Sequence, residues 1–202
     1  MTPWKNGGKM KKRDYVVRVL SLAPILAAVF IIFLYVTQRQ MFGSVWTFVS
    51  MLITLGIMPL LAYPFQLVIP KLRMGGRKAQ RTLAMIFAVV GYVLCVILLL
   101  ILGGTNREFF ICLTYLVSGI LILIINKVFK VHASGHGCGV CDPVIVLLIL
   151  KCYIKAALYA VSAIFVCISS VRSKRHTLPE FLGGASVSMI SAIVLATFLL
   201  WV

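Results

Sequence analysis

Long apolar runs separated by short polar segments dominate the chain. The runs extend over residues 16–36, 45–69, 82–102, 109–125 and 181–202. A helix rises 1.5 Å per residue, so roughly 17–25 apolar residues span the hydrocarbon core of a bilayer. The pattern therefore predicts five helices that each cross a membrane.

A further apolar region, from Gly137 to Ser170, is too long for one span. The segment KCYIK, from Lys151 to Lys155, places two lysines inside it. A charged side chain near the middle of a bilayer is costly. We therefore predict a helical hairpin that turns at these lysines, with two short arms. The chain is expected to be an all-α polytopic membrane helix bundle with six to seven transmembrane segments.

The pattern predicts a single membrane domain, residues 1–202. Residues 1–15 form a basic tail, residues 16–69 an N-terminal helical hairpin, and residues 70–202 the core that carries most polar segments. The first apolar run exceeds the 7–15 residues of a signal-peptide core and is not followed by a small-residue cleavage site. We therefore expect a retained first span.

The composition supports a membrane protein and gives it a strong positive charge. Apolar residues make up 62% of the chain, and Lys and Arg number 20 against 4 Asp and Glu. In a soluble protein this charge would suggest nucleic-acid binding, but the apolar runs leave no surface for it. Basic loops facing the cytoplasm and anionic lipid headgroups explain the charge better. The basic tail predicts a cytoplasmic N-terminus, with residues 70–81, 126–136 and 171–180 on the same side.

The acidic and sulfur-containing residues exclude some chemistries. The only carboxylates are those of Asp14 in the tail, Glu108 in a short loop, Asp142 and Glu180. They are too few and too scattered for a Mg²⁺ site built from clustered acids. The cysteines mostly lie in or beside apolar runs, so no disulfide framework is predicted.

The segment KVFKVHASGHGCGVCDP, residues 127–143, raises the question of a metal site. It contains His132, His136, Cys138 and Cys141, all of them zinc-type ligands. Structural zinc sites usually pair two knuckles across a longer arm, and ligands packed this closely around glycines would strain a tetrahedral site. We predict no metal site, and we interpret the two cysteines as small residues at the start of a membrane helix.

The same segment has features of a phosphate site. Ala133, Ser134, Gly135 and His136 place a hydroxyl and a glycine before a histidine at a predicted helix start. Helix N-termini present free N–H groups and a positive dipole to anions. Glycine also lets the backbone approach a ligand closely. A plain polar loop is the alternative for this segment alone.

A second polar segment, RSKRHTLPEFLGG, adds a possible nucleophile. Pro179 predicts the first turn of the last helix, so Glu180 can meet His176 across one turn and orient its imidazole. A histidine held in this way can attack phosphorus, while His136 protonates the leaving oxygen. Nearby arginines can bind phosphoryl oxygens in a bidentate manner.

Together these residues resemble the membrane phosphatases of the phosphatidic-acid phosphatase type 2 superfamily, in a divergent prokaryotic form. ASGH, residues 133–136, resembles the family's Pro-Ser-Gly-His motif. RHTLPEFLGG, residues 175–184, resembles the His-Thr-x-x-Glu-x-x-x-Gly form of the third motif. Arg77 and Arg81 resemble basic residues that some prokaryotic members carry in the first motif. The resemblance covers roughly residues 70–202.

The resemblance implies hydrolysis of a lipid phosphomonoester or an isoprenoid diphosphate through a phosphohistidine, without metal or other cofactor. His176 would be the nucleophile, Glu180 its orienting partner and His136 the general acid. The phosphate-binding groups implied are Ser134, Gly135, Lys130, Arg172, Arg175, Arg77 and Arg81. The partner would be a membrane lipid and not a nucleic acid, at a cytoplasm-facing site in a bacterial plasma membrane.

The chain departs from the family pattern at several positions. The third-motif arginine is expected at residue 170, where this chain has Ser170. Glu180 replaces an aspartate, Ala133 replaces a proline, and the Arg-Pro pair of the first motif is missing. An inactive relative that binds phospholipid headgroups is therefore an alternative, and a small membrane transporter is another.

Overall fold

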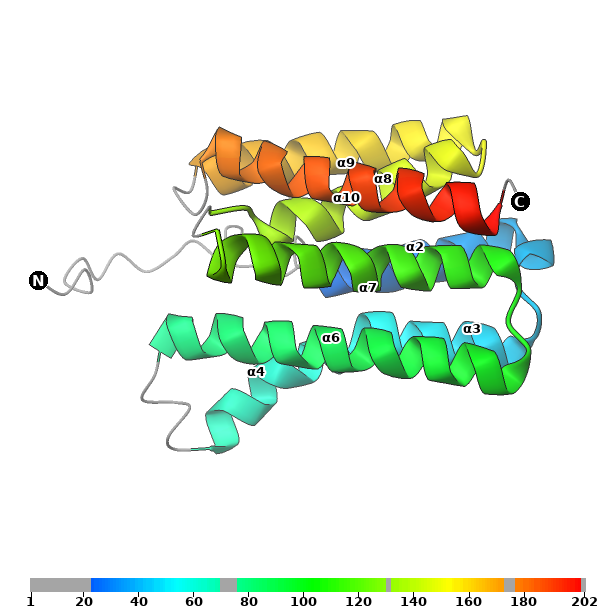
Figure 1. Ribbon diagram of the computed structural model, residues 1–202, viewed down its shortest axis with the longest axis horizontal. Helices are drawn as coiled ribbons and strands as arrows, with labels where there is room; N and C mark the ends of the chain where they lie inside the picture. The colour runs from blue at the N-terminus through cyan, green and yellow to red at the C-terminus, as the bar shows by residue number, and fades with distance from the viewer. Residues whose placement is uncertain (1–22, 70–75, 130–131, 173–176, 201–202) are drawn as a thin grey trace, which may run out of the picture.

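The computed structural model describes residues 23–69, 76–129, 132–172 and 177–200, except for the side chains at positions 77, 78 and 81. Within these residues the secondary structure is helical, which confirms the predicted all-α class (Figure 1). The elements are α2 (Ala23–Thr37), η1 (Arg39–Met41), α3 (Val45–Met51), the π-helix η2 (Leu52–Ile57), α4 (Met58–Val68), α6 (Gly76–Leu102), α7 (Asn106–Lys127), α8 (Gly135–Ile149), α9 (Tyr153–Arg172) and α10 (Leu178–Leu199).

Five helical segments of the described chain are long and apolar enough to cross a membrane. They are Val45–Val68, Thr82–Leu102, Asn106–Lys127, Tyr153–Arg172 and Leu178–Leu199. Two further apolar helices, α2 and α8, are shorter, at 15 residues each. The chain is thus an integral membrane protein by helix length and composition.

The predicted hairpin within residues 137–170 is present. Helix α8 ends at Ile149 and α9 begins at Tyr153, and the N–H of Cys152 donates to the carbonyl of Leu147 over 2.8 Å. Lys151 closes the turn with a φ of 59°. The expectation of two short arms was wrong for the second arm, because α9 continues to Arg172 and reaches 20 residues.

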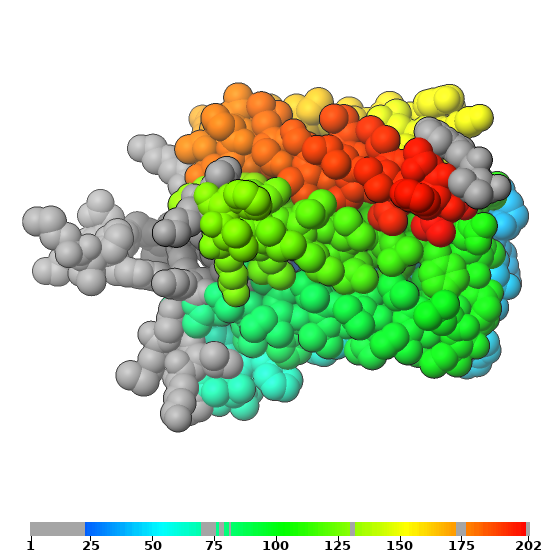
Figure 2. Space-filling model, viewed as in Figure 1, coloured from blue at the N-terminus to red at the C-terminus, as the bar shows by residue number. Residues whose placement is uncertain are grey.

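The helices form three layers (Figure 1). Helices α3, α4 and α6 make one outer layer, α2 and α7 lie in the middle, and α8, α9 and α10 make the other outer layer. The side chains of α6, α7 and α10 form a continuous surface on the face shown in Figure 2.

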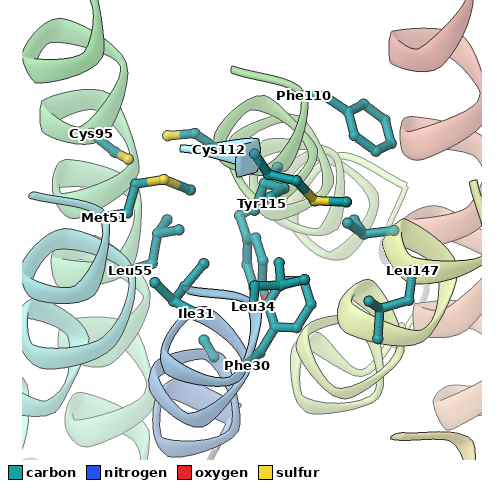
Figure 3. Packing of buried hydrophobic residues seen from close by; sticks show 14 of the residues in the cluster. Phe30, Ile31, Leu34, Met51, Leu55, Cys95, Phe110, Cys112, Tyr115 and Leu147 are labelled. Atoms are coloured by element: carbon teal, nitrogen blue, oxygen red, sulfur yellow. The ribbon is translucent and has the colours of Figure 1, made fainter. Parts of the chain in front are cut away.

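One apolar core joins the layers. One buried cluster includes Phe30 and Leu34 of α2, Leu55 of η2, Phe110 of α7 and Leu147 of α8, and all five are fully buried (Figure 3). Residues 16–69 and 70–202, which the sequence separates into a hairpin and a core, therefore share one interior in their described parts.

The sequence suggested that Glu108 lies in a short loop. In the structure it belongs to this interior instead. It is fully buried in the first turn of α7 and forms a capping box with Thr105. Its Oε2 accepts the N–H of Thr105 at 2.8 Å and the N–H of Gly43 at 3.1 Å. A single carboxylate thus caps α7 and fixes the segment between α2 and α3 to it.

Helix α6 approaches the π-helix so closely that one position requires glycine. A Cβ on Gly91 would lie 2.4 Å from the carbonyl oxygen of Thr54, whereas a Cβ on Gly119 would meet only the Tyr92 ring, at 3.4 Å. We expect Gly91→Ala to lower stability by roughly 1–3 kcal/mol through overpacking. Gly119→Ala should be neutral or stabilising, since alanine favours helix by about 1 kcal/mol. Thermal unfolding in detergent measures both, and equal melting of the two variants would contradict the close contact.

Candidate functional site

The described parts of the predicted polar segments lie at one end of the bundle. This end carries the C-terminal ends of α4, α7 and α9 and the N-terminal ends of α6, α8 and α10 (Figure 1). We call this the polar end. The described parts of residues 70–81, 126–136 and 171–180 thus share one end of the molecule, as the sequence predicted.

The two motif segments are in direct contact at the polar end. The N–H of Ser134, just before α8, donates to the backbone carbonyl of Glu180 in α10 over 2.9 Å. A Cβ on Gly184 would lie 2.2 Å from the carbonyl oxygen of Ser134, and a Cβ on Gly137 would lie 2.8 Å from that of Phe181. Glycine at both positions therefore allows the backbones of α8 and α10 to touch.

Ser134 is the N-cap of α8. Its Oγ accepts the N–H of Gly137 at 3.1 Å, and the residue is 1% exposed. Helix α8 begins at Gly135, which confirms the helix start predicted from ASGH. His136 follows as the second helical residue and is half-buried, so its imidazole belongs to the first turn.

An amide that the sequence analysis did not single out holds the segment before this cap. Asn126, in the last turn of α7, donates to the carbonyl of Ala133 over 2.9 Å and accepts its N–H at 2.7 Å. This pair of hydrogen bonds sets the backbone conformation at the entry to α8. The only available signal was an amide at the end of an apolar run beside a polar segment.

Glu180 lies in the first turn of α10, next to Pro179, as predicted. Thr177 is the N-cap, and its side chain and that of Glu180 form a capping box. Glu180 Oε2 accepts the N–H of Thr177 at 3.1 Å. The carboxylate thus binds the residue that follows His176 in the chain, and the helix itself begins only at Leu178.

Several predicted site residues are not described by the structure. His176, Arg175 and Lys130 lie outside the described residues, and the side chains of Arg77 and Arg81 are not described either. Both of these arginines are in the first turns of α6, at the polar end. Arg172 is exposed at the last position of α9, and Ser170, two residues earlier, is buried.

Cys138 and Cys141 are the two cysteines that the sequence offered as metal ligands. Among the described residues, no three His, Cys, Asp or Glu side chains come together in a way that could hold a metal ion. Cys138 is buried inside α8 and packs with Ile122 and Val187. It is thus a small core residue of α8, as interpreted from the sequence.

Asp142 is the principal side chain whose position the sequence analysis missed. In the sequence Asp142 falls within the polar segment of residues 127–143, but in the structure it is 1% exposed in the middle of α8. Ser118 of α7 and Ser188 of α10 hydrogen bond to its carboxyl group. The available signal was an acidic residue inside an apolar region, which is usually paired within a bundle.

Comparisons with known proteins add no further information to this geometry. The chain matches no protein-family model, no curated protein and no solved structure.

Proposed function

We propose that this chain is an integral membrane phosphatase that hydrolyses a lipid phosphomonoester or an isoprenoid diphosphate without a metal ion. The observation that carries the proposal is the contact between the starts of α8 and α10, through Ser134 and Glu180. Segments distant in the sequence, each with part of the predicted chemistry, meet at one point. A histidine pair acting on one phosphoryl group requires such a meeting.

The two helix starts also suit an anion. Helices α8 and α10, of 15 and 22 residues, both begin at the polar end. Each N-terminus carries a partial positive charge and N–H groups without intrahelical acceptors. Arg172 at the end of α9 and Arg77 and Arg81 in the first turns of α6 belong to the same end of the bundle. A phosphate group with two or more negative charges is the ligand class that this end favours.

The reaction would proceed in two steps. His176 attacks phosphorus, the bond from phosphorus to the lipid oxygen breaks, and His136 gives its proton to that oxygen. Water then attacks the phosphohistidine, His136 takes a proton from that water, and inorganic phosphate leaves. Glu180, which binds the N–H of Thr177, would orient the histidine just before it.

The proposal includes an arrangement in the membrane. If α2 and α8 cross the bilayer together with the five longer segments, the chain has seven spans. By the positive-inside rule, the basic N-terminal tail and the polar end would then face the cytoplasm. The membrane would be a bacterial plasma membrane, as the resemblance implies. The substrate would be a lipid of the inner leaflet.

A second candidate is an inactive relative that binds phospholipid headgroups without hydrolysing them. Ser170, at the position of the third-motif arginine, is 3% exposed and belongs to the packed part of α9. An arginine there would be needed to bind the phosphoryl oxygens in the family's manner. This observation favours a site with weakened phosphate binding.

Phosphate release by the purified full-length chain in detergent tests the proposal. Phosphatidate and farnesyl diphosphate serve as substrates, each in the presence of EDTA. We expect release to continue in EDTA and to fall to the blank rate in His176→Ala, because that variant has no nucleophile.

His132→Ala is the matched control, since His132 is exposed before α8 and has no role in the proposed reaction. Its rate should equal that of the wild type. Loss of activity in EDTA would indicate a catalytic metal and exclude the proposed mechanism. Binding of both lipids without release would favour the inactive relative.

A further inference from the structure

Asp142 places a carboxyl group inside the bundle, away from the polar end. It is in the middle of α8 and 1% exposed. An ionised carboxylate removed from water is costly unless a cation or several hydrogen-bond donors compensate its charge. The neighbours of Asp142 therefore decide which form of the side chain the fold can hold.

Two serine hydroxyls contact the two carboxyl oxygens. Ser188 Oγ lies 2.5 Å from Oδ1, and Ser118 Oγ lies 3.3 Å from Oδ2. Both serines are buried, at 0% and 1% exposure respectively. The three side chains link α7, α8 and α10 by hydrogen bonds.

Among the described residues, no positively charged side chain contacts the Asp142 carboxyl. In the part of the chain that the structure describes, the carboxyl makes hydrogen bonds only to Ser118 and Ser188, and it forms no ion pair. Among the described residues, four titratable side chains interact electrostatically with Asp142: Tyr92 of α6, Tyr115 of α7, and Cys138 and Cys141 of α8. Phenols and thiols are ordinarily neutral near pH 7.

The contacts of Ser118 also favour a protonated Asp142 carboxyl group. Its Oγ lies 3.3 Å from Asp142 Oδ2 and also 3.3 Å from the carbonyl oxygen of Tyr115. A hydroxyl has one hydrogen to donate and lone pairs with which to accept. As the donor in both contacts, Ser118 would have to share its one hydrogen between two acceptors. Each contact has its own hydrogen if Asp142 donates to Ser118 and Ser118 donates to the carbonyl. With Ser188 donating to Oδ1, each of the three contacts then has one hydrogen.

We propose that Asp142 is a neutral carboxylic acid at pH 7 and that it clamps α7, α8 and α10 together. The acid form both donates and accepts, which an ionised carboxylate cannot do. It also avoids the cost of a buried charge. Because α8 and α10 touch at the polar end, the clamp is a second fixed point in their relative placement.

Infrared spectroscopy of the purified full-length protein tests the protonation state directly and does not depend on any enzymatic activity. The difference between the wild type and Asp142→Asn at pH 7 should contain the C=O stretching band of a protonated carboxylic acid. Glu180→Gln is the comparison, because a carboxylate that accepts a backbone N–H at a helix start should give carboxylate bands. Carboxylate bands from Asp142 would overturn the proposal.

Thermal unfolding in detergent tests the clamp. Asp142→Asn keeps an acceptor for Ser188 and a donor for Ser118 without charge, so its melting temperature should stay close to that of the wild type. Ser188→Ala should melt several degrees lower, because a buried acceptor loses its donor. Ser191→Ala is the matched control on α10, since the Ser191 hydroxyl donates to the carbonyl of Val187 in its own helix. If Ser188→Ala melts like Ser191→Ala, or if Asp142→Asn melts far below the wild type, the neutral clamp is excluded.

Discussion

Replacing His136 with alanine is expected to lower phosphate release from phosphatidate by about 10²–10⁴-fold, the range typical of a lost general acid. In the proposed reaction the glycerol oxygen leaves as a poor leaving group and needs a proton from His136. His136 is half-buried in the first turn of α8, so its removal should not unfold the protein. The initial rate with phosphatidate in detergent micelles measures the effect.

The leaving group provides the decisive control for His136. An aryl phosphate such as p-nitrophenyl phosphate has a leaving group that needs little protonation, so His136→Ala should lose much less activity with it. His176→Ala should lose activity equally with both substrates, because both need the nucleophile. Equal losses in His136→Ala with the two substrates would argue against a general-acid role.

Gly184→Ala is expected to separate α8 from α10 and to cost about 3 kcal/mol or more of stability, at the upper end of overpacking effects. Its Cβ would lie 2.2 Å from the carbonyl oxygen of Ser134 and 2.8 Å from the N of Cys138. Both are backbone atoms of the α8 start, so no side-chain rotation can relieve the clash. At roughly 2–4 °C for each kcal/mol in a chain of this size, thermal unfolding will resolve the loss.

Gly183→Ala is the matched control, one residue earlier in the same helix. Its Cβ would come no closer than 3.8 Å to any atom of Ala133, an ordinary contact. The variant should melt at or slightly above the wild-type temperature, because alanine is the better helix former. A Gly184→Ala variant as stable as Gly183→Ala would show that α8 and α10 do not pack as described. If the proposed function holds, Gly184→Ala should also lose phosphatase activity.

The helices themselves follow from local sequence. Apolar runs of sufficient length define α6, α7 and α10, and the lysines of KCYIK mark the turn between α8 and α9. Ser134 and Pro179 indicate where α8 and α10 begin. These features depend on residues within a turn or two of each other, so hydrophobic length and capping chemistry suffice to predict them.

Part of the candidate site could also be predicted from the sequence. The polar segments fall at alternate helix ends, so an even number of crossings between them places them on one side. The number of crossings is even only with the hairpin at Lys151, which the structure contains. The placement of His176 lies outside the described residues, so its pairing with Glu180 stays a prediction.

The contacts between helices were decided only by the tertiary structure. The sequence alone marks Asp142 and Glu108 as acids, but it cannot tell that the first meets Ser118 and Ser188, which lie 24 and 46 positions away. Nor can it tell that the second holds Gly43, 65 positions away. Likewise, the sequence does not distinguish Gly184 from the other small residues of α10, and only the structure shows that the backbone of Ser134 lies beside it. Hydrophobic length and caps are properties of a single helix, whereas these partners are chosen by how the helices pack.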